Sequence, residues 1–289
     1  MNYDGGKGNA GVWQNLINQI PPHDEWIEPF LGGGALAVRI RPAARMIGID
    51  RDAQALQAFQ QAHSTLPIAL HCCDGIEWLK HRFDMFRRDV SPSVAKEQFF
   101  AAAYRDARAH VPFVFVDAPY IIAARRNGRP MYHFEMSEEK HTELLVILRE
   151  LPALVMVVHY PHPLYEKALQ GWRTWTYRGW TRRGPAIEQV WTNFPEPAVL
   201  HDARFVGRDR RERERIRRRV ESWRQMIVDM PAGERQAVLE ALAEDGRPGG
   251  DAAEGGRICT RCRTSRPADV RACPVCRAVE SQSIFRSVF

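Results

Sequence analysis

The chain has 289 residues, of which 45% are hydrophobic and 26% are charged, and its formal net charge is +6. This length accommodates one large domain with an appendage, or two modest domains, and the composition is that of a globular protein. The N-terminal residues lack the apolar core of a signal peptide, and no apolar run reaches the length of a membrane span. These features exclude secretory and membrane-embedded classes from our expectations and favour a cytoplasmic protein.

The positive charge is concentrated in the last third of the sequence. Arginines accumulate in residues 204–224 and again in residues 257–277, whereas the first two hundred residues are close to neutral. Localised basic charge of this kind is typical of proteins that bind nucleic acid, and we expect such a partner here.

The first two hundred residues alternate between predicted strands and predicted helices. Strands are expected at residues 26–30, 45–49, 68–73, 111–116 and 154–158, and helices at residues 12–20, 52–63, 92–109 and 138–150, the last capped by Ser137, with others beginning near residue 76 and ending near residue 171. Two β-rich segments, 172–177 and 187–194, predict an antiparallel hairpin at the edge of the sheet. Alternation of this kind predicts an α/β fold, a Rossmann-like doubly wound sheet.

A run of glycines follows the first predicted strand. Gly32, Gly33 and Gly34 permit the backbone to approach a ligand closely and to enter a helix without Cβ collisions. Asp50 ends the second strand about twenty residues after the glycines, where an acidic group commonly binds ribose hydroxyls. Glycines alone are a weak signal, since many such turns carry glycine for packing. The glycines together with the spaced aspartate predict a site for a nucleoside-bearing cofactor.

The third predicted strand ends at Asp74. Its carboxylate has two equally weighted interpretations, a bond to the base of the cofactor or the N-cap of the helix that begins near Ile76. Adjacent Cys72 and Cys73 are interpreted as small buried core residues rather than metal ligands.

The segment Asp117–Tyr120, with the sequence DAPY, emerges from an apolar strand rich in β-branched and aromatic residues. Ligands in open α/β sheets bind beyond the carboxyl ends of the strands. A carboxylate and main-chain carbonyls can accept the N–H groups of a flat amino-bearing base, and the tyrosine ring can cover its face. Taken alone, the segment is more often an ordinary strand-to-loop exit.

A basic loop with aromatic neighbours follows Tyr120. Positive charge beside aromatics suits a nucleic-acid backbone with a displaced base, although a solvated loop is an equal alternative. The candidate nucleic-acid contacts in this loop and in the predicted hairpin turn are Arg125, Arg126, Arg129, Arg182 and Arg183. His159 and His162 lie after the next strand, but no third ligand has convincing spacing, so no metal site is predicted there.

Five segments together resemble the Dam-like (D12 class) DNA adenine methyltransferases. They are residues 5–8 (GGKG), residues 28–34 (EPFLGGG), Asp50, Asp117–Tyr120 and residues 188–193 (EQVWTN), in the order that this family shows. The resemblance covers roughly residues 1–195. It implies the S-adenosylmethionine (SAM)-dependent methyltransferase fold, SAM as the cofactor and N6-methyladenine in DNA as the product, in a cytoplasmic protein of prokaryotic or phage type associated with the nucleoid.

The resemblance also implies roles for individual residues. Asp50 would bind the ribose of the cofactor, and the remaining cofactor contacts would be Tyr3, Gly6, Lys7, Glu28, Phe30, Gly32, Gly34 and Asp74. The catalytic segment would be Asp117, Ala118, Pro119 and Tyr120, with Tyr120 stacked on an adenine extruded from the duplex.

The chain departs from the family pattern at two places. The second position of the usual D-P-P-Y motif is Ala118, which keeps the main-chain carbonyl and loses the rigidity of the ring, so we expect activity to survive. The interval between Asp74 and Val111 holds little more than two helices, whereas Dam-like enzymes commonly carry a larger recognition domain there. Sequence recognition is therefore relaxed, or it is moved to the loop after Tyr120 or to the C-terminal region.

The C-terminal region is of a different character. We expect a methyltransferase domain over residues 1–200, an arginine-rich helical extension over residues 201–245, a Gly/Pro-rich linker over residues 246–256 and a small module over residues 257–289. Two C-x-x-C pairs in this module, Cys259, Cys262, Cys273 and Cys276, predict a structural zinc ion with four thiolate ligands. The surrounding arginines favour nucleic-acid contact over protein docking.

Several functions remain open from the sequence. The leading one is adenine-N6 methylation of DNA, and the enzymatic alternatives are adenine methylation in RNA and N4 methylation of cytosine. The non-enzyme alternative is a nucleic-acid-binding protein of the same fold with weak or no turnover, for which Ala118 is the warning sign.

Overall fold

The computed structural model describes residues 11–83, 111–125, 128–181, 184–245, 256–258 and 265–267. The chain divides into two compact units with a boundary at Arg213, and each is described by itself. The predicted helix over residues 92–109 lies outside the described residues, as does most of the predicted linker.

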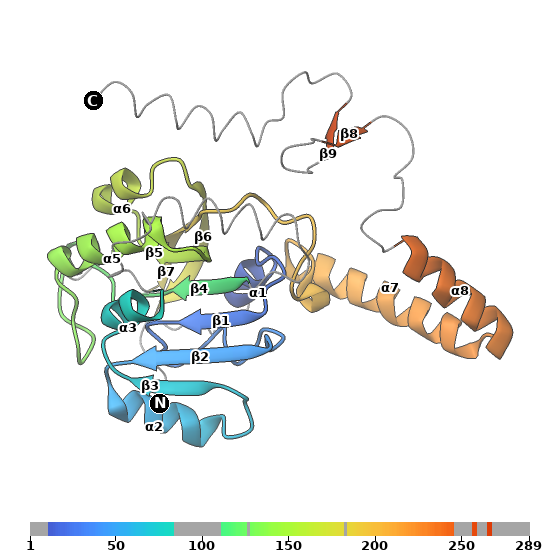
Figure 1. Ribbon diagram of the computed structural model, residues 1–289, viewed down its shortest axis with the longest axis horizontal. Helices are drawn as coiled ribbons and strands as arrows, with labels where there is room; N and C mark the ends of the chain where they lie inside the picture. The colour runs from blue at the N-terminus through green and yellow to red at the C-terminus, as the bar shows by residue number, and fades with distance from the viewer. Residues whose placement is uncertain are drawn as a thin grey trace. The chain divides into compact units, whose positions relative to one another are not determined.

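The first unit is built on a seven-stranded mixed sheet in the order β3-β2-β1-β4-β5-β7-β6. Strands β1 to β5 run parallel, β7 runs antiparallel to β5, and β6 forms the antiparallel edge against β7. Figure 1 shows β4, β1, β2 and β3 side by side. The strands are β1 (Glu25–Glu28), β2 (Arg45–Asp50), β3 (Ala69–Cys72), β4 (Pro112–Val116), β5 (Leu154–His159), β6 (Arg173–Thr181) and β7 (Gly184–Thr192). The predicted Rossmann-like sheet and the edge hairpin are both present.

The described helices of this unit lie where the sequence pattern predicts helices. They are α1 (Val12–Ile17), α2 (Ala53–Ala62), α3 (Gly75–Arg82), α5 (Glu138–Glu150) and α6 (Pro163–Ala168), with the short 3-10 helices η1 (Ile122–Ala124) and η2 (Ala203–Phe205). Side-chain caps fix several helix starts, because the first N–H groups of a helix have no partner within it. Asp52 caps α2, Asp74 caps α3 and Ser137 caps α5.

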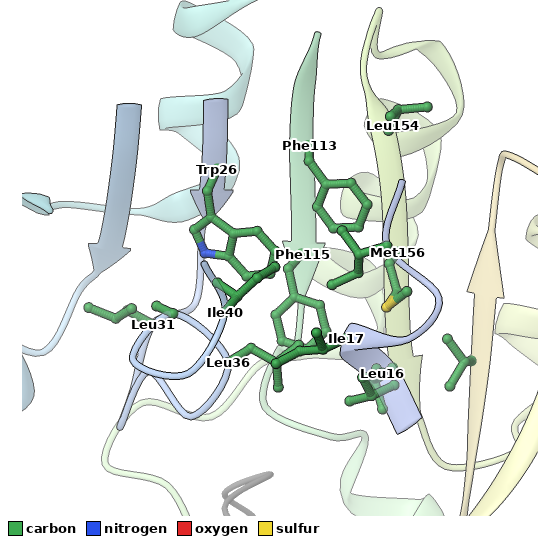
Figure 2. Close-up of a cluster of buried hydrophobic side chains, with 14 of the residues drawn as sticks. Leu16, Ile17, Trp26, Leu31, Leu36, Ile40, Phe113, Phe115, Leu154 and Met156 are labelled. Carbon is green, nitrogen blue, oxygen red and sulfur yellow. The ribbon is translucent and has the colours of Figure 1, made fainter. Parts of the chain in front are cut away.

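The central strands β1, β4 and β5 are buried on both faces, since consecutive strand residues point to opposite sides and every residue of these strands is buried. On one face, Trp26 of β1 stacks on Phe113 of β4 with ring centroids 5.4 Å apart. Figure 2 shows these rings with Phe115, and with leucine and isoleucine side chains from α1 and from the turn after β1. The intervening residues, Val114 among them, pack on the other face with residues of α3, α5 and α6. The sheet is therefore the middle layer of three.

Two expectations about this unit are wrong. Cys72 and Cys73 are exposed rather than buried. They lie at the end of β3, the edge strand of the sheet, where no further strand is hydrogen-bonded on the outer side among the described residues. The glycine run does not lead into a regular helix either. Residues 29–40 form successive turns, although Leu36 and Ile40 bury their side chains as a helix face would.

The second unit contains two charged helices and a small ribbon. Helix α7 (Arg210–Asp229), which begins at the boundary, and α8 (Ala232–Asp245) match the predicted helical extension, and β8 (Gly256–Ile258) pairs antiparallel with β9 (Ser265–Pro267). No residue of α7 is buried. Over the ranges that the structure describes, no helix is both long and apolar enough to cross a membrane.

Candidate functional site

A cavity lies at the carboxyl ends of the parallel strands, where the chain leaves β1, β2, β3 and β4. Because the strand order reverses direction between β1 and β4, this edge is where an open α/β sheet offers room for a ligand. The cavity is lined by residues 28–35, 50–52, 74–76, Phe115, Asp117, Pro119, residues 132–136 and Lys140. Residues far apart in the sequence therefore surround one space.

The glycine turn and Asp50 are joined by a direct hydrogen bond. The Gly32 N–H donates to Oδ2 of Asp50 at 2.7 Å, and the Asp52 N–H donates to Oδ1 at 2.9 Å. Gly32 and Gly34 have φ values of 49° and 55°, in the left-handed region that favours glycine. A Cβ at Gly34 would also lie 2.3 Å from Cε2 of Phe59. Asp50 thus holds the turn in place while still lining the cavity.

Asp74 has both of the properties that the sequence left open. It caps α3 by accepting the Ile76 and Glu77 N–H groups at 2.9 and 3.2 Å, and it also lines the cavity. Both capping bonds fall on Oδ1, so helix capping uses one of the two carboxylate oxygens. Gly75, the residue after Asp74, packs closely against the backbone just after β1, because a Cβ at Gly75 would lie 2.1 Å from the Pro29 carbonyl oxygen.

Glu28 places a buried carboxyl at the base of the cavity. Its side chain accepts a hydrogen bond from Trp26 Nε1 at 3.2 Å. Burial raises the pKa of Glu28 well above its ordinary range, and the nearby charges of Asp117 and Asp50 act in the same direction. Burial likewise raises the pKa of Asp50, against the backbone N–H groups that stabilise its charged form. Burial therefore makes both of these carboxyl groups harder to ionise than they would be in water.

The DAPY segment is divided between the cavity and the core. Asp117 and Pro119 line the cavity, and Asp117 is close enough to Glu28 to affect its pKa. Ala118 is buried in the core cluster on the face covered by α3 and α5. Tyr120 is also buried, and among the described residues it does not belong to the cavity wall.

Tyr120 is held by groups from β5 and β7. Its hydroxyl donates to Glu188 Oε2 at 3.1 Å, and Tyr177 donates to the same oxygen. Its ring packs against His159 and Tyr160, with centroid distances of 4.8 and 4.6 Å. Glu188 belongs to the segment that contributed to the family resemblance, and here it anchors two buried tyrosines. Burial raises the pKa of both tyrosines well above the ordinary value, so both hydroxyls are donors.

The histidines near this cluster are structural. The Ile121 N–H donates to His159 Nε2 at 2.9 Å, so the other ring nitrogen, Nδ1, carries the proton that it shares with the Tyr160 carbonyl at 2.7 Å. His141 Nδ1 lies 2.8 Å from the Tyr165 hydroxyl, and burial lowers the pKa of His141 to about 4. Within the described ranges, no group of three or more His, Cys, Asp or Glu residues is arranged to hold a metal ion.

The loop after Tyr120 contributes residues 132–136 to the cavity wall and is braced by an ion pair. Arg125 forms two hydrogen bonds to the Glu135 carboxylate and one to the Tyr120 carbonyl, and its side chain is only 3% exposed. The pKa of Glu135 is lowered to about 2, because bonds from Arg125 and from the Tyr132 and Met131 N–H groups outweigh the opposing effect of burial. Arg125 was predicted to contact nucleic acid, and its buried, paired position does not support that role. Arg129 is exposed and stays a candidate.

Several predicted site residues lie outside the described residues. They are the cofactor candidates Tyr3, Gly6 and Lys7, the nucleic-acid candidates Arg126, Arg182 and Arg183, and the zinc ligands Cys259, Cys262, Cys273 and Cys276. Their roles stay predictions.

The structure adds residues to the site that the sequence did not single out. Phe115, Arg51, Asp52, Ile76 and Lys140 all line the cavity. Asp52, Arg51 and Ile76 lie within two residues of the predicted Asp50 and Asp74, so their proximity to the strand ends was a usable signal. Lys140 had no such signal, because it lies in the first turn of α5, on an element that carries none of the predicted site residues.

The chain matches no family model and no curated protein sequence. Among solved structures it is similar to a precorrin 8W decarboxylase from Methanobacterium thermoautotrophicum (12% identity, 66% of this chain and 94% of that chain covered, TM-score 0.37). It is also similar to an rRNA methylase from Streptococcus thermophilus (12%, 63% and 94%, TM-score 0.35). A third is magnesium protoporphyrin IX methyltransferase from Synechocystis PCC 6803 with bound SAM (13%, 64% and 76%, TM-score 0.36).

The strand order and the site together define the class of the fold. A seven-stranded mixed sheet with one strand reversed between two others, flanked by helices, matches the SAM-dependent methyltransferase fold. The cavity lies beyond the carboxyl ends of the parallel strands, where open α/β sheets bind ligands.

Proposed function

We propose that this protein transfers a methyl group from SAM to the N6 amino group of adenine in DNA, acting on a base extruded from the duplex. The observation that carries the proposal is that Asp117 lines the same cavity as the glycine turn and Asp50. An acceptor for an exocyclic amine and a nucleoside-binding turn therefore share one space, as direct transfer between two bound reactants needs.

The residues of the cavity wall fit the proposed cofactor. SAM carries a sulfonium and an ammonium group, and the carboxyl groups of Asp50, Asp74 and Asp117 line the cavity. The glycine turn removes side chains where a ligand approaches the backbone, and the Asp50 carboxylate, which lines the cavity, accepts hydroxyl groups of the ribose. When bound, SAM supplies an electrophilic methyl group.

The acceptor side is provided by the DAPY segment. The adenine amino group is a poor nucleophile, because its lone pair is delocalised into the ring. The Asp117 carboxylate accepts one N–H of this amine and the Ala118 main-chain carbonyl accepts the other, so the nitrogen becomes pyramidal and its lone pair becomes available. Preorganised acceptors of this kind stabilise the positive charge that develops on nitrogen. The substitution of alanine for the usual proline leaves the required carbonyl in place.

The C-terminal region belongs to the proposal as a nucleic-acid contact. Helix α7 carries an excess of arginine over acidic residues, and Arg217 and Arg218 are more than two-thirds exposed. Part of this charge is neutralised by intrahelical pairs such as Arg217–Glu214, and the remainder suits phosphate groups. We propose that the four-cysteine module binds one structural zinc ion, which metal analysis of the purified protein tests directly. We also propose that the module adds to the nucleic-acid contact of α7.

The deciding experiment incubates the protein with methyl-labelled SAM and duplex DNA, single-stranded DNA or RNA, then digests the nucleic acid and identifies the labelled nucleoside. We expect N6-methyladenine in DNA. Label only in RNA would replace DNA by RNA as the substrate, and label on cytosine would overturn the choice of base. Binding of SAM without transfer to any of the substrates would favour a binding protein of the same fold.

A further inference from the structure

The aromatic residue expected to cover the acceptor base does not face the cavity. Tyr120 is 3% exposed, its hydroxyl is bonded to Glu188, and its ring is packed against His159 and Tyr160. To stack on a base in the cavity it would have to leave these contacts and expose the buried Glu188 carboxylate. Loss of such a buried bond is costly, even though Tyr177 would still donate to the same Glu188 oxygen.

Tyr132, unlike Tyr120, is an aromatic residue of the cavity wall. It lines the cavity together with Asp117 and Pro119, although it lies twelve residues beyond the DAPY segment. The Arg125 guanidinium lies 5.0 Å from the centre of its ring, and the Tyr132 N–H donates to Glu135 Oε1 at 2.9 Å. These contacts order both the ring and its backbone, which reduces the entropy lost when a ligand packs against them.

One guanidinium connects this ring to the proposed catalytic segment. Arg125 contacts the ring of Tyr132, binds the Glu135 carboxylate and donates to the carbonyl of Tyr120. The position of Tyr132 is therefore fixed relative to the backbone that carries Asp117 and Ala118.

A second aromatic residue of the same loop lies toward the other end of the cavity. The Arg51 guanidinium is 4.8 Å from the ring centre of Phe134, and neighbouring His133 lies 3.3 Å from Asp52 Oδ2. Arg51 and Asp52 follow Asp50, which places Phe134 at the cofactor end of the site. The loop thus contributes two rings to the cavity wall, one beside Arg125 and the other beside Arg51.

We propose that Tyr132, rather than Tyr120, is the stacking surface for the acceptor base, and that Tyr120 positions the segment from within the core. This inference rests on the proposed function, since it assigns one face of the same site to a purine ring. A ring ordered by an arginine and placed beside an acceptor carboxylate suits a flat, π-rich base that carries an amino group.

The test compares full-length variants Tyr132→Ala, Tyr132→Phe and Phe134→Ala with the unmodified protein. Steady-state transfer to oligodeoxyadenylate gives kcat and KM for DNA. Separate titrations give the Kd of SAM and, with S-adenosylhomocysteine present, the Kd of oligodeoxyadenylate containing one 2-aminopurine. We expect Tyr132→Ala to weaken DNA binding about tenfold, the scale of one lost base–aromatic stack, with the Kd of SAM within about twofold. Tyr132→Phe should restore binding, and Phe134→Ala should weaken SAM instead.

The outcomes separate this inference from the proposed function. If the unmodified protein binds the oligonucleotide but transfers no methyl group, the proposed function fails, while the affinity of Tyr132→Ala still tests the stack. Unchanged DNA affinity in a folded Tyr132→Ala protein would overturn the inference, as would an equal loss of SAM affinity. Should Tyr132→Ala unfold, Tyr132→Leu keeps the bulk without the aromatic face, and full DNA affinity in that variant would overturn it as well.

Discussion

Residues of similar type are buried in the sheet and exposed to solvent in helix α7. Trp26 in β1 is fully buried between strands, whereas Trp223 in α7 is 62% exposed. Charged groups differ in the same way. Glu28 is buried beside Asp117, while Glu214 of α7 lies at the surface and pairs with Arg217 and Arg218. In the sheet, side chains are fixed by tertiary packing, and along α7 the polar contacts come largely from residues three or four positions away.

Because of this difference, substitutions in the sheet unit should have larger effects than substitutions along α7. Burial makes the free energy of folding and the pKa values of the sheet unit sensitive to single atoms. Exposed intrahelical ion pairs contribute little each, because water and salt screen them. Substitutions matched by residue type between the two regions test the comparison.

The largest effect is expected at Asp117. Asp117→Ala should lower methyl transfer by at least about a thousandfold, because the amine loses the acceptor that stabilises its developing charge. The Kd of SAM should stay within about twofold, as measured by equilibrium titration. The matched control is Asp229→Ala at the end of α7, which we expect to leave transfer unchanged. Retained turnover in Asp117→Ala would remove this residue from its proposed role.

A core ring and an exposed ring should differ strongly in stability. Phe113→Ala should lower the free energy of unfolding by roughly 3–5 kcal/mol, because it removes a ring that is stacked on Trp26 and leaves a cavity. Trp223→Ala should change it by no more than about 0.5 kcal/mol. Urea unfolding followed by circular dichroism compares the two variants. A large loss for Trp223→Ala would show that a partner or another part of the chain covers this face of α7.

Acid should destabilise the sheet unit through His23. Burial and the stacked His201 lower the pKa of His23 from 6.5 to about 3, against a bond to Pro21 and the charge of Asp24. The unfolded chain therefore takes up a proton first as pH falls below 6.5, and folding stability decreases toward pH 3. At about pH 4.5 this amounts to roughly 3 kcal/mol.

His23→Phe keeps an aromatic ring and removes the titration. We expect its urea midpoint to fall less than that of the unmodified protein between about pH 6.5 and about pH 4.5. Helix α7 contains no histidine, so it lacks this response. Parallel pH profiles of the two proteins would show that His23 is not the titrating group.

The smallest effect on the fold is expected from the C-terminal module. Deleting residues 251–289 should leave a folded, SAM-binding protein with weaker nucleic-acid affinity and a shallower dependence of affinity on salt, because basic groups that displace counterions are removed. Titrations at several salt concentrations measure both quantities. Unchanged affinity and slope would assign the module to another kind of partner.

Local sequence patterns were sufficient for most of the elements. The apolar run before Asp117 predicted β4, and Ser137 predicted the start of α5 within one residue. Both predictions succeeded because the hydrophobicity of a strand and the cap of a helix are determined by residues adjacent in the sequence. Cys72 and Cys73 were wrongly expected to be buried, because burial depends on whether another strand lies beyond β3.

The sequence by itself determined the alternation of strands and helices, the glycine turn and the acidic residues at the strand ends, since each is written in a short stretch of chain. Only the tertiary structure decided which of these groups meet. Parallel strands bring Asp50, Asp74 and Asp117 to one edge of the sheet. The contacts of β5 and β7 draw Tyr120 into the core, and the Arg125–Glu135 pair brings Tyr132 to the cavity. No spacing rule encodes these positions, because they depend on packing between residues distant in the chain.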